Sequence, residues 1–328
     1  MQRREFIAAA AGAVAVAAGV VGRATAREGA GITGAGSGPI DVATFHASRR
    51  FARTAFGRIA YVERGAGPAA LFLHGLPLNG FQWRGAVERL APYRRCIAPD
   101  SMGLGYGEIP EGQALAPEAQ VEMLAALLDA LSVPAVDLVG SDSGGAVAQL
   151  FVARLPDRVR SLLLTNCDAH EDSPPPALLP VIAASRAGTF ADEVLAPQLR
   201  DKASSRLSTG LAGCCYTDPA RLTPEAIDCY LAPLLSSPLR KAQLHAYCVA
   251  LERNPLLAIE PALKRCQAPL RVVWGTGDTI FAASSPDWLD RTFPRSRGIR
   301  RVDGANLFFP EEFPDVIAEE ARRLWLGA

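Results

Sequence analysis

Five short and almost continuous apolar runs constrain the fold of this chain more than any other feature. They read AALFLHG, RRCIAPD, AVDLVG, SLLLTN and LRVVWG, and each is bounded by turn residues. Such runs suit strands that are buried on both faces, as in a parallel sheet covered by helices. Helix-like stretches such as PEAQVEMLAALLDAL alternate with them. This alternation predicts an α/β fold with a doubly wound, mostly parallel sheet.

The segment 171–254 interrupts the alternation. It contains helical stretches punctuated by proline and has no strand pattern. We interpret it as a helical lid inserted between the sixth and seventh strands, so the core should comprise residues 45–170 and 255–328. Alternating segments on both sides of Phe56-Gly57 also predict a β-hairpin near the start of the core.

The first 26 residues have the features of an export signal. Arg3 and Arg4 precede an apolar stretch of roughly fifteen residues, which ends at an A-x-A cleavage pattern. RREFI resembles a twin-arginine signal, and the apolar stretch is too short to span a bilayer comfortably. We expect cleavage after Ala26, a glycine-rich linker over 27–44 and a periplasmic or secreted protein with no stable membrane span after cleavage.

Charge and cysteine usage exclude several kinds of partner. The chain has 34 basic and 34 acidic residues, so it lacks the positive excess with which proteins neutralise nucleic-acid phosphates. Its seven cysteines form no C-x-x-C pair and no Cys/His ligand spacing. We therefore expect mostly buried thiols, no metal site, no cofactor and no nucleic-acid partner, and leave the oligomeric state open.

The stretch VGSDSGGA, residues 139–146, lies between a predicted strand and a predicted helix. Small residues stand two positions before and two positions after both Asp142 and Ser143, so either residue could lie at the centre of a tight turn. The apolar strand ends at Val139. Centring the turn on Ser143 would extend the sheet through Asp142 and desolvate its carboxylate with no evident partner. The pattern therefore favours Asp142 as the projecting group.

This turn resembles the nucleophile elbow of the α/β-hydrolase family. The motif HGLP is similar to the oxyanion-hole motif of that family, PDSMGLGYGE to its next turn, and VVWGTGDTIF to the strand end that carries its acid. The resemblance covers about residues 45 to 325. It implies oxyanion-hole donors at the backbone N–H groups of Leu76 and Ser143, and an acid at Asp278.

An aspartate in the pattern G-x-D-x-G-G is similar to the haloalkane dehalogenase and epoxide hydrolase branch of the family. The resemblance implies that Asp142 attacks an sp3 carbon of a small organic substrate and forms an alkyl-enzyme ester. Ser143 and Leu76 occupy the positions where family dehalogenases commonly hold a halide, so a halide cradle with two donors is not evident. Tyr230 and Tyr247 in the predicted lid are candidates for activating an epoxide oxygen.

The family pattern G-A-G-H-F-x-P-E-E aligns with GANLFFPEE at 304–312, which puts Leu307 in the histidine position. Leucine cannot transfer a proton, and losing a base costs on the order of a hundredfold to ten-thousandfold in the step it assists. His170 follows the sixth strand at the edge where such sheets place their sites, so we predict it as an alternative base. Asp168 and Glu171 could orient His170 or act alone.

Three functions therefore remain open. The first is a hydrolase that uses Asp142 as nucleophile, similar to haloalkane dehalogenases or epoxide hydrolases. The second is a serine esterase that uses Ser143 as nucleophile, and His170 is a candidate partner for it. The third is a non-hydrolytic binding protein, or a lyase or isomerase that uses Asp142 as a base, and Leu307 favours this third reading. His46 and His245 are expected at the surface or in packing positions.

Overall fold

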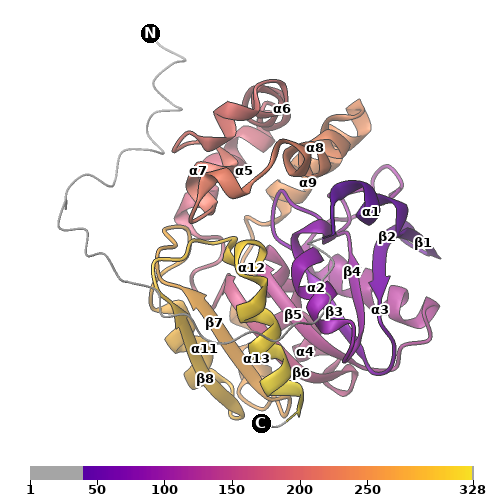
Figure 1. Ribbon diagram of the computed structural model, residues 1–328, viewed down its shortest axis with the longest axis vertical. Coiled ribbons are helices and arrows are strands. Elements are labelled where there is room, and N and C mark those ends of the chain that lie inside the picture. The colour runs from indigo at the N-terminus through magenta and orange to yellow at the C-terminus, as the bar shows by residue number, and fades with distance from the viewer. Residues whose placement is uncertain (1–39, 327–328) are drawn as a thin grey trace, which may run out of the picture.

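The structure, a computed structural model, describes residues 40–326 (Figure 1). Its centre is an eight-stranded sheet in the order β1-β2-β4-β3-β5-β6-β7-β8. The strands are β1 Arg49–Thr54, β2 Gly57–Arg64, β3 Ala69–Leu73, β4 Arg95–Pro99, β5 Val136–Asp142, β6 Val159–Cys167, β7 Leu270–Gly275 and β8 Ser296–Val302. In this order, each pair of neighbouring strands from β4 through β3, β5, β6 and β7 to β8 is parallel. Strands β1 and β2 form an antiparallel hairpin that closes at Thr54 and Gly57. The predicted α/β fold and the predicted hairpin are confirmed.

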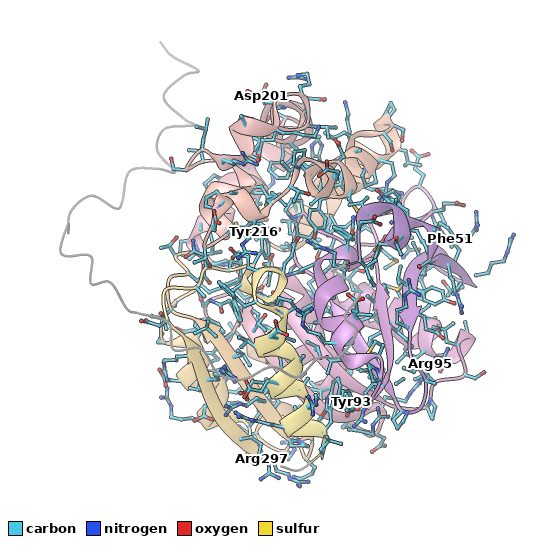
Figure 2. The ribbon with its side chains drawn as sticks, in the orientation of Figure 1. Phe51, Tyr93, Arg95, Asp201, Tyr216 and Arg297 are labelled. Carbon is cyan, nitrogen blue, oxygen red and sulfur yellow. The ribbon has the colours of Figure 1, made fainter. Side chains whose placement is uncertain are left out.

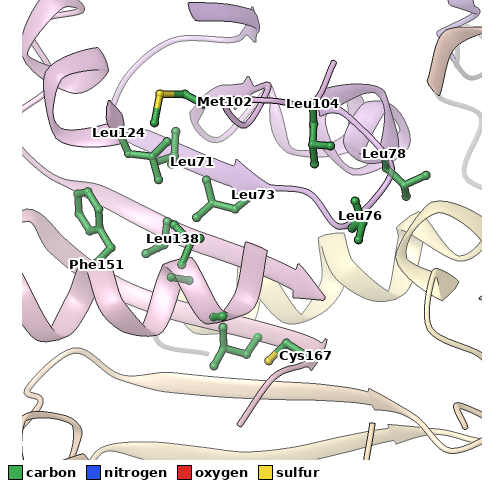
Figure 3. Packing of buried hydrophobic residues seen from close by; sticks show 14 of the residues in the cluster. Leu71, Leu73, Leu76, Leu78, Met102, Leu104, Leu124, Leu138, Phe151 and Cys167 are labelled. Atoms are coloured by element: carbon green, nitrogen blue, oxygen red, sulfur yellow. The ribbon is translucent and has the colours of Figure 1, made fainter. Parts of the chain in front are cut away.

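Helices cover both faces of this sheet. One face packs Leu71 and Leu138 with Phe151, in the layer that contains α3 Pro117–Ala130 and α4 Ser143–Arg154. Figure 3 shows Leu138 and Phe151 together in this layer. On the other face Phe72 and Val139 pack with α2 Arg84–Leu90 and α13 Pro314–Leu326. Successive residues of a strand point to opposite faces, so an unbroken apolar run is required to fill both layers.

A set of helices separates β6 from β7, which we call the inserted helices. They are α5 Leu179–Arg186, α6 Ala196–Arg200, α7 Leu211–Cys215, α8 Pro224–Leu235 and α9 Pro238–Ala250. Figure 1 shows them grouped over one end of the sheet. Three short helices surround the last strands: α10 Glu260–Leu263 precedes β7, α11 Ser285–Thr292 connects β7 to β8, and α12 Phe309–Glu312 follows β8. The boundaries of the predicted lid stay a prediction.

The predicted linker over 27–44 was wrong at its end, because a helix begins inside it. Helix α1, Val42–Ala47, overlaps the last residues of that linker, because the Asp41 side chain caps it by accepting a hydrogen bond of 2.7 Å from the Thr44 N–H. Phe45 anchors α1 by packing edge-on against Phe81. The predicted export signal lies outside the described residues. Within residues 40–326, no helix has the length and apolar character needed to cross a membrane.

Candidate active site

The turn between β5 and α4 holds Asp142 in a strained conformation. Asp142 has φ 54° and ψ −134°, a region that residues other than glycine adopt rarely and at an energetic cost. A Cβ atom at Gly140 would lie 2.9 Å from the carbonyl oxygen of Gly144, and one at Gly144 would lie 2.5 Å from that of His74. Asp142 is therefore the centre of the turn, as predicted, and Ser143 is the first residue of the helix. The strand end expected at Val139 was wrong, because β5 continues to Asp142 and the turn bends sharply only at that residue.

Backbone N–H groups hold the Asp142 carboxylate. Oδ2 accepts a hydrogen bond of 2.9 Å from the Leu76 N–H, and the Ser143 N–H also donates to the carboxylate. A Cβ atom at Gly75 would overlap with Oδ2, so this close approach requires glycine. The two donors that the sequence suggested for an oxyanion hole therefore converge on one carboxylate.

Two residues support the loop that contains Leu76. Gln82 accepts a hydrogen bond of 3.0 Å from the Gly75 N–H and donates one of 3.4 Å to Ser141, which ties the loop to β5. The buried His74 ring lies 2.9 Å from the Gly75 carbonyl oxygen through Nδ1 and accepts from the Ser101 N–H through Nε2. Both ring nitrogens are occupied, which indicates a structural role for His74. Sequence reasoning missed Gln82, because no motif marks it.

Three carboxylates meet at the ends of adjacent strands. Asp142 pairs with Cys167 in the register of β5 and β6, so Asp168 follows immediately beside it. Asp278 follows β7, accepting hydrogen bonds of 2.8 Å from the Asn166 side chain and from the Ile280 N–H. Parallel strands bring their carboxyl ends to one edge of the sheet, which explains why residues far apart in sequence converge here.

Burial raises the pKa values of all three carboxyl groups. The pKa of Asp142 lies well above its usual range because of desolvation and then the charge of Asp168, although the N–H groups of Leu76 and Ser143 oppose this shift. Desolvation also raises the pKa of Asp168 to about 7 and raises that of Asp278. Perturbed pKa values at one edge of a sheet are typical of a catalytic site.

The predicted base His170 lies in a different environment. Its Nε2 is 3.2 Å from Glu260 Oε2, and its ring stacks on Trp288 with centroids 4.7 Å apart. Its backbone is also unusual, with φ 50°. Among the interactions described for residues 40–326, none joins His170 to Asp142. Its role as a base stays a prediction.

The other histidines are also engaged elsewhere. The His46 Nε2 lies 3.2 Å from the Tyr106 hydroxyl, and His245 accepts a hydrogen bond of 3.1 Å from the Ala191 N–H. Neither residue contacts Asp142 in the described interactions.

Leu307 lies buried in the loop after β8, with 3% of its surface exposed. Its neighbours fasten this loop to the inserted helices. The Phe308 N–H donates a hydrogen bond of 2.9 Å to the Cys215 carbonyl oxygen, and the Asn306 side chain donates one of 3.0 Å to the Tyr216 carbonyl oxygen. A nonpolar side chain that cannot transfer protons therefore occupies this position.

The two predicted substrate-binding tyrosines have different partners. The Tyr247 hydroxyl donates a hydrogen bond of 3.1 Å to the Ser143 hydroxyl oxygen, so Tyr247 reaches the elbow. The Tyr230 hydroxyl instead donates one of 2.9 Å to Glu311 Oε2. The structure thus brings Tyr247 to the predicted site, while Tyr230 belongs to a separate polar cluster.

That second cluster, which we call the Glu311 cluster, joins the inserted helices to the core. Glu311 accepts hydrogen bonds of 2.6 Å from Arg84 and from the Tyr216 hydroxyl in addition to that of Tyr230. In Figure 2, Tyr216 is labelled at the boundary between the inserted helices and the sheet domain. Burial, and then the Glu311 charge, raise the pKa values of both tyrosines. Sequence reasoning did not find this cluster, because its members come from four separate segments.

Comparisons with known proteins identify the family. The model of the alpha/beta hydrolase fold family matches residues 68–313. A haloalkane dehalogenase of Mesorhizobium japonicum is 44% identical over 105 residues, 32% of this chain and 34% of that protein. A 2-hydroxy-6-oxo-2,4-heptadienoate hydrolase of Pseudomonas putida is 41% identical over 103 residues, 30% of this chain and 37% of that protein. The chain thus spans only about a third of the length of these curated relatives.

Solved structures extend the likeness in fold over most of the chain. The epoxide hydrolase CorEH superposes with a TM-score of 0.67 at 22% identity, covering 85% of this chain and 98% of that chain. A putative lipase from Acinetobacter baumannii superposes with a TM-score of 0.72 at 17% identity, covering 90% of this chain and 98% of that chain. From the family match and this shared architecture, the chain belongs to the alpha/beta hydrolase fold family.

Proposed function

We propose that this protein is a hydrolase that attacks a small organic substrate, a haloalkane or an epoxide, with the Asp142 carboxylate. The observation that carries this proposal is the hydrogen bond of 2.9 Å from the Leu76 N–H to one carboxylate oxygen, Oδ2, at a strained elbow. This leaves the other oxygen available as a nucleophile. The partial similarity to a haloalkane dehalogenase supports the same chemistry.

In the first step Asp142 Oδ1 forms a bond to an sp3 carbon of the substrate, and the bond from that carbon to halide or to the epoxide oxygen breaks. An ester between Asp142 and the substrate results. In the second step a water molecule adds to the ester carbonyl carbon and loses a proton to a base. The bond from that carbon to Oδ1 then breaks, which releases the alcohol and restores the Asp142 carboxylate. The Leu76 N–H already donates to Oδ2 and the Ser143 N–H donates to the same carboxylate, so both are placed to stabilise the oxyanion that forms.

The water needs a base, and Asp168 is the first candidate. It follows β6 directly beside the elbow, and its pKa of about 7 suits proton transfer near neutral pH. His170 is the second candidate, but it would first have to leave Glu260 and Trp288. Variants Asp168→Asn and His170→Gln separate the two, because only loss of the true base should prolong the lifetime of the ester.

A single turnover in water enriched in heavy oxygen tests the nucleophile. Enzyme is used in excess over a bromoalkane or an epoxide. The oxygen added to the attacked carbon should then come from Asp142, and the heavy isotope should enter the Asp142 carboxylate. Asp142→Asn should abolish product formation, and Ser143→Ala should retain it. Heavy oxygen in the product of the first turnover, with none in Asp142, would contradict covalent attack by this residue.

Two alternatives have observations in their favour. Ser143 is hydrogen-bonded to Tyr247 beside the elbow, and a serine esterase would be labelled there by a fluorophosphonate. Leu307 and the raised pKa of Asp142 favour a lyase or isomerase in which Asp142 transfers a proton, or a binding protein without turnover. Such a lyase or isomerase would exchange a substrate C–H hydrogen with heavy water and would form no ester.

Export is a separate proposal that rests on the N-terminal sequence. We propose that the twin-arginine-like segment directs the folded protein out of the cytoplasm and is removed after Ala26. Replacing Arg3 and Arg4 with lysine should retain the precursor inside cells. Cell fractionation tests whether the variant precursor is retained, and N-terminal sequencing of the mature wild-type protein tests cleavage after Ala26.

A further inference from the structure

Two consecutive cysteines lie at the end of α7, in the inserted helices. The Sγ atoms of Cys214 and Cys215 are 3.0 Å apart, closer than two unbonded sulfur atoms normally approach. Cys214 is partly exposed and Cys215 is buried with 7% exposure. A reagent could therefore reach the first thiol from solvent, and the second thiol is already within reach of the first.

This pair adjoins the candidate active site. The neighbouring Cys214 thiol and then burial raise the pKa of the Cys215 thiol, and the charges of the Asp142 and Asp278 carboxylates raise it further. The Cys215 carbonyl oxygen accepts the hydrogen bond from the Phe308 N–H, directly after Leu307. The pair thus contacts the loop that occupies the histidine position of the family pattern.

We propose that Cys214 and Cys215 are a covalent modification site, at which a small-molecule disulfide converts the two thiols into a vicinal disulfide. The Cys214 thiolate attacks the reagent disulfide, which forms a mixed disulfide and expels one thiolate. Cys215 then loses its proton and attacks Cys214 Sγ, which expels the second thiolate. Two protein thiols are oxidised, and one reagent disulfide is reduced to two thiols.

The bond formed in this way should be labile. Consecutive Cα atoms lie about 3.8 Å apart, whereas disulfides usually join Cα atoms about 4.4–6.8 Å apart. The resulting strain favours reduction, as in disulfides that act as switches. Closure must also shorten the separation of the sulfur atoms from 3.0 Å to about 2.05 Å. Closure therefore moves the two side chains at the end of α7, next to the contact of the Cys215 carbonyl oxygen with the Phe308 N–H.

Peptide mass spectrometry of the full chain tests the proposal, using oxidised glutathione as the probe and then an alkylating reagent. Trypsin cleavage after Arg206 and Arg221 isolates the pair from the other five cysteines. We expect this peptide to lose two hydrogen masses, to resist alkylation and to recover both thiols after dithiothreitol. Alkylation of both residues after oxidation, or a persistent glutathione adduct on the wild-type chain, would refute the proposal.

Three variants define the order of events. Cys215→Ser should stop at a stable glutathione adduct on Cys214, because the resolving thiol is missing. Cys214→Ser should form neither the adduct nor the disulfide, because Cys215 is buried. Cys266→Ser is the matched control and should oxidise at the pair like the wild type. The mass readout needs no substrate, so its failure is distinguishable from failure of the proposed function.

Discussion

The Leu76 N–H donates a hydrogen bond of 2.9 Å to Oδ2 of Asp142, linking the loop after β3 to the elbow after β5. These residues are 66 positions apart in the chain, and the parallel pairing of β3 with β5 brings them together. The same contact orients the carboxylate and leaves one oxygen for chemistry. It is therefore the geometric basis of the proposed mechanism.

Gly75→Ala should disturb this contact without altering any ionisable group. The new Cβ atom would overlap with Asp142 Oδ2, so the carboxylate must move away from the Leu76 N–H. Misplacing a catalytic group by about 1 Å can cost on the order of a hundredfold in rate. We expect a loss of that size in the rate of ester formation.

Gly107→Ala is the control for this change, because its Cβ atom would meet its neighbours at ordinary contact distances of 3.5 Å and more. Stopped-flow or quenched-flow measurement of ester formation compares the two variants. Equal rates in both would show that the Gly75 position does not control Asp142.

Asp168→Asn should stabilise the fold at neutral and alkaline pH. Burial raises the folded-state pKa of Asp168 from 3.8 to about 7, so the folded state binds more protons than the unfolded state between these values. The free energy of unfolding must then fall as pH rises from about 4 to about 7, by an amount on the order of 4 kcal/mol for this group. Asparagine has no proton to lose and should remove that slope.

Urea titrations at pH 4.5, 6 and 8 measure this effect, with the exposed Asp157→Asn as control. The variant should gain most over the wild type at pH 8, although it should lose the proposed water-activating base. A gain that is independent of pH would contradict the assigned cause.

Leu307→His should restore a base to the loop after β8. If the Asp142 ester accumulates in the wild type, a histidine within reach should shorten its lifetime by on the order of a hundredfold to ten-thousandfold. Leu307→Gln is the matched control, since glutamine is polar and of similar size but cannot act as a base. Mass spectrometry of the ester over time gives the lifetimes, and equal lifetimes in the two variants would exclude a base function at this position.

Glu311→Gln should weaken the attachment of the inserted helices. The Glu311 side chain, 3% exposed, pairs with Arg84, and removing one partner of a buried ion pair costs about 3–5 kcal/mol. The exposed Glu111→Gln is the control. Chemical denaturation should show the loss in Glu311→Gln only, and limited proteolysis should then cleave first within the α5–α9 segment.

The elbow between β5 and α4 shows which features of the site could be predicted from the sequence. Small residues left both Asp142 and Ser143 open, and the expected strand end at Val139 was wrong, because β5 continues to Asp142. The predicted centre of the turn, Asp142, is nevertheless the residue with the strained backbone. The family resemblance, carried by short motifs at strand ends, supplied Leu76, Ser143 and Asp278. These are local consequences of strand ends and turns, and such consequences can be derived from a continuous stretch of chain.

Side-chain partners could not be derived in this way. Tyr230 and Tyr247 were equivalent candidates in the sequence, yet one bonds to Glu311 and the other to Ser143. His170 follows the expected strand, but its ring lies against Glu260 and Trp288. Each partner comes from a segment that is distant in the chain, so packing had to be known first.

The amino-acid sequence alone therefore determined the layered α/β fold, its hairpin and the residue at the elbow, since apolar periodicity and the steric needs of a tight turn act over neighbouring residues. Only the tertiary structure decided which groups surround that carboxylate, and hence its raised pKa. It also decided that Cys215 lies near Asp142 and Asp278. Desolvation and charge–charge interactions depend on distances through space. Only folding makes those distances short between segments that are far apart in the sequence.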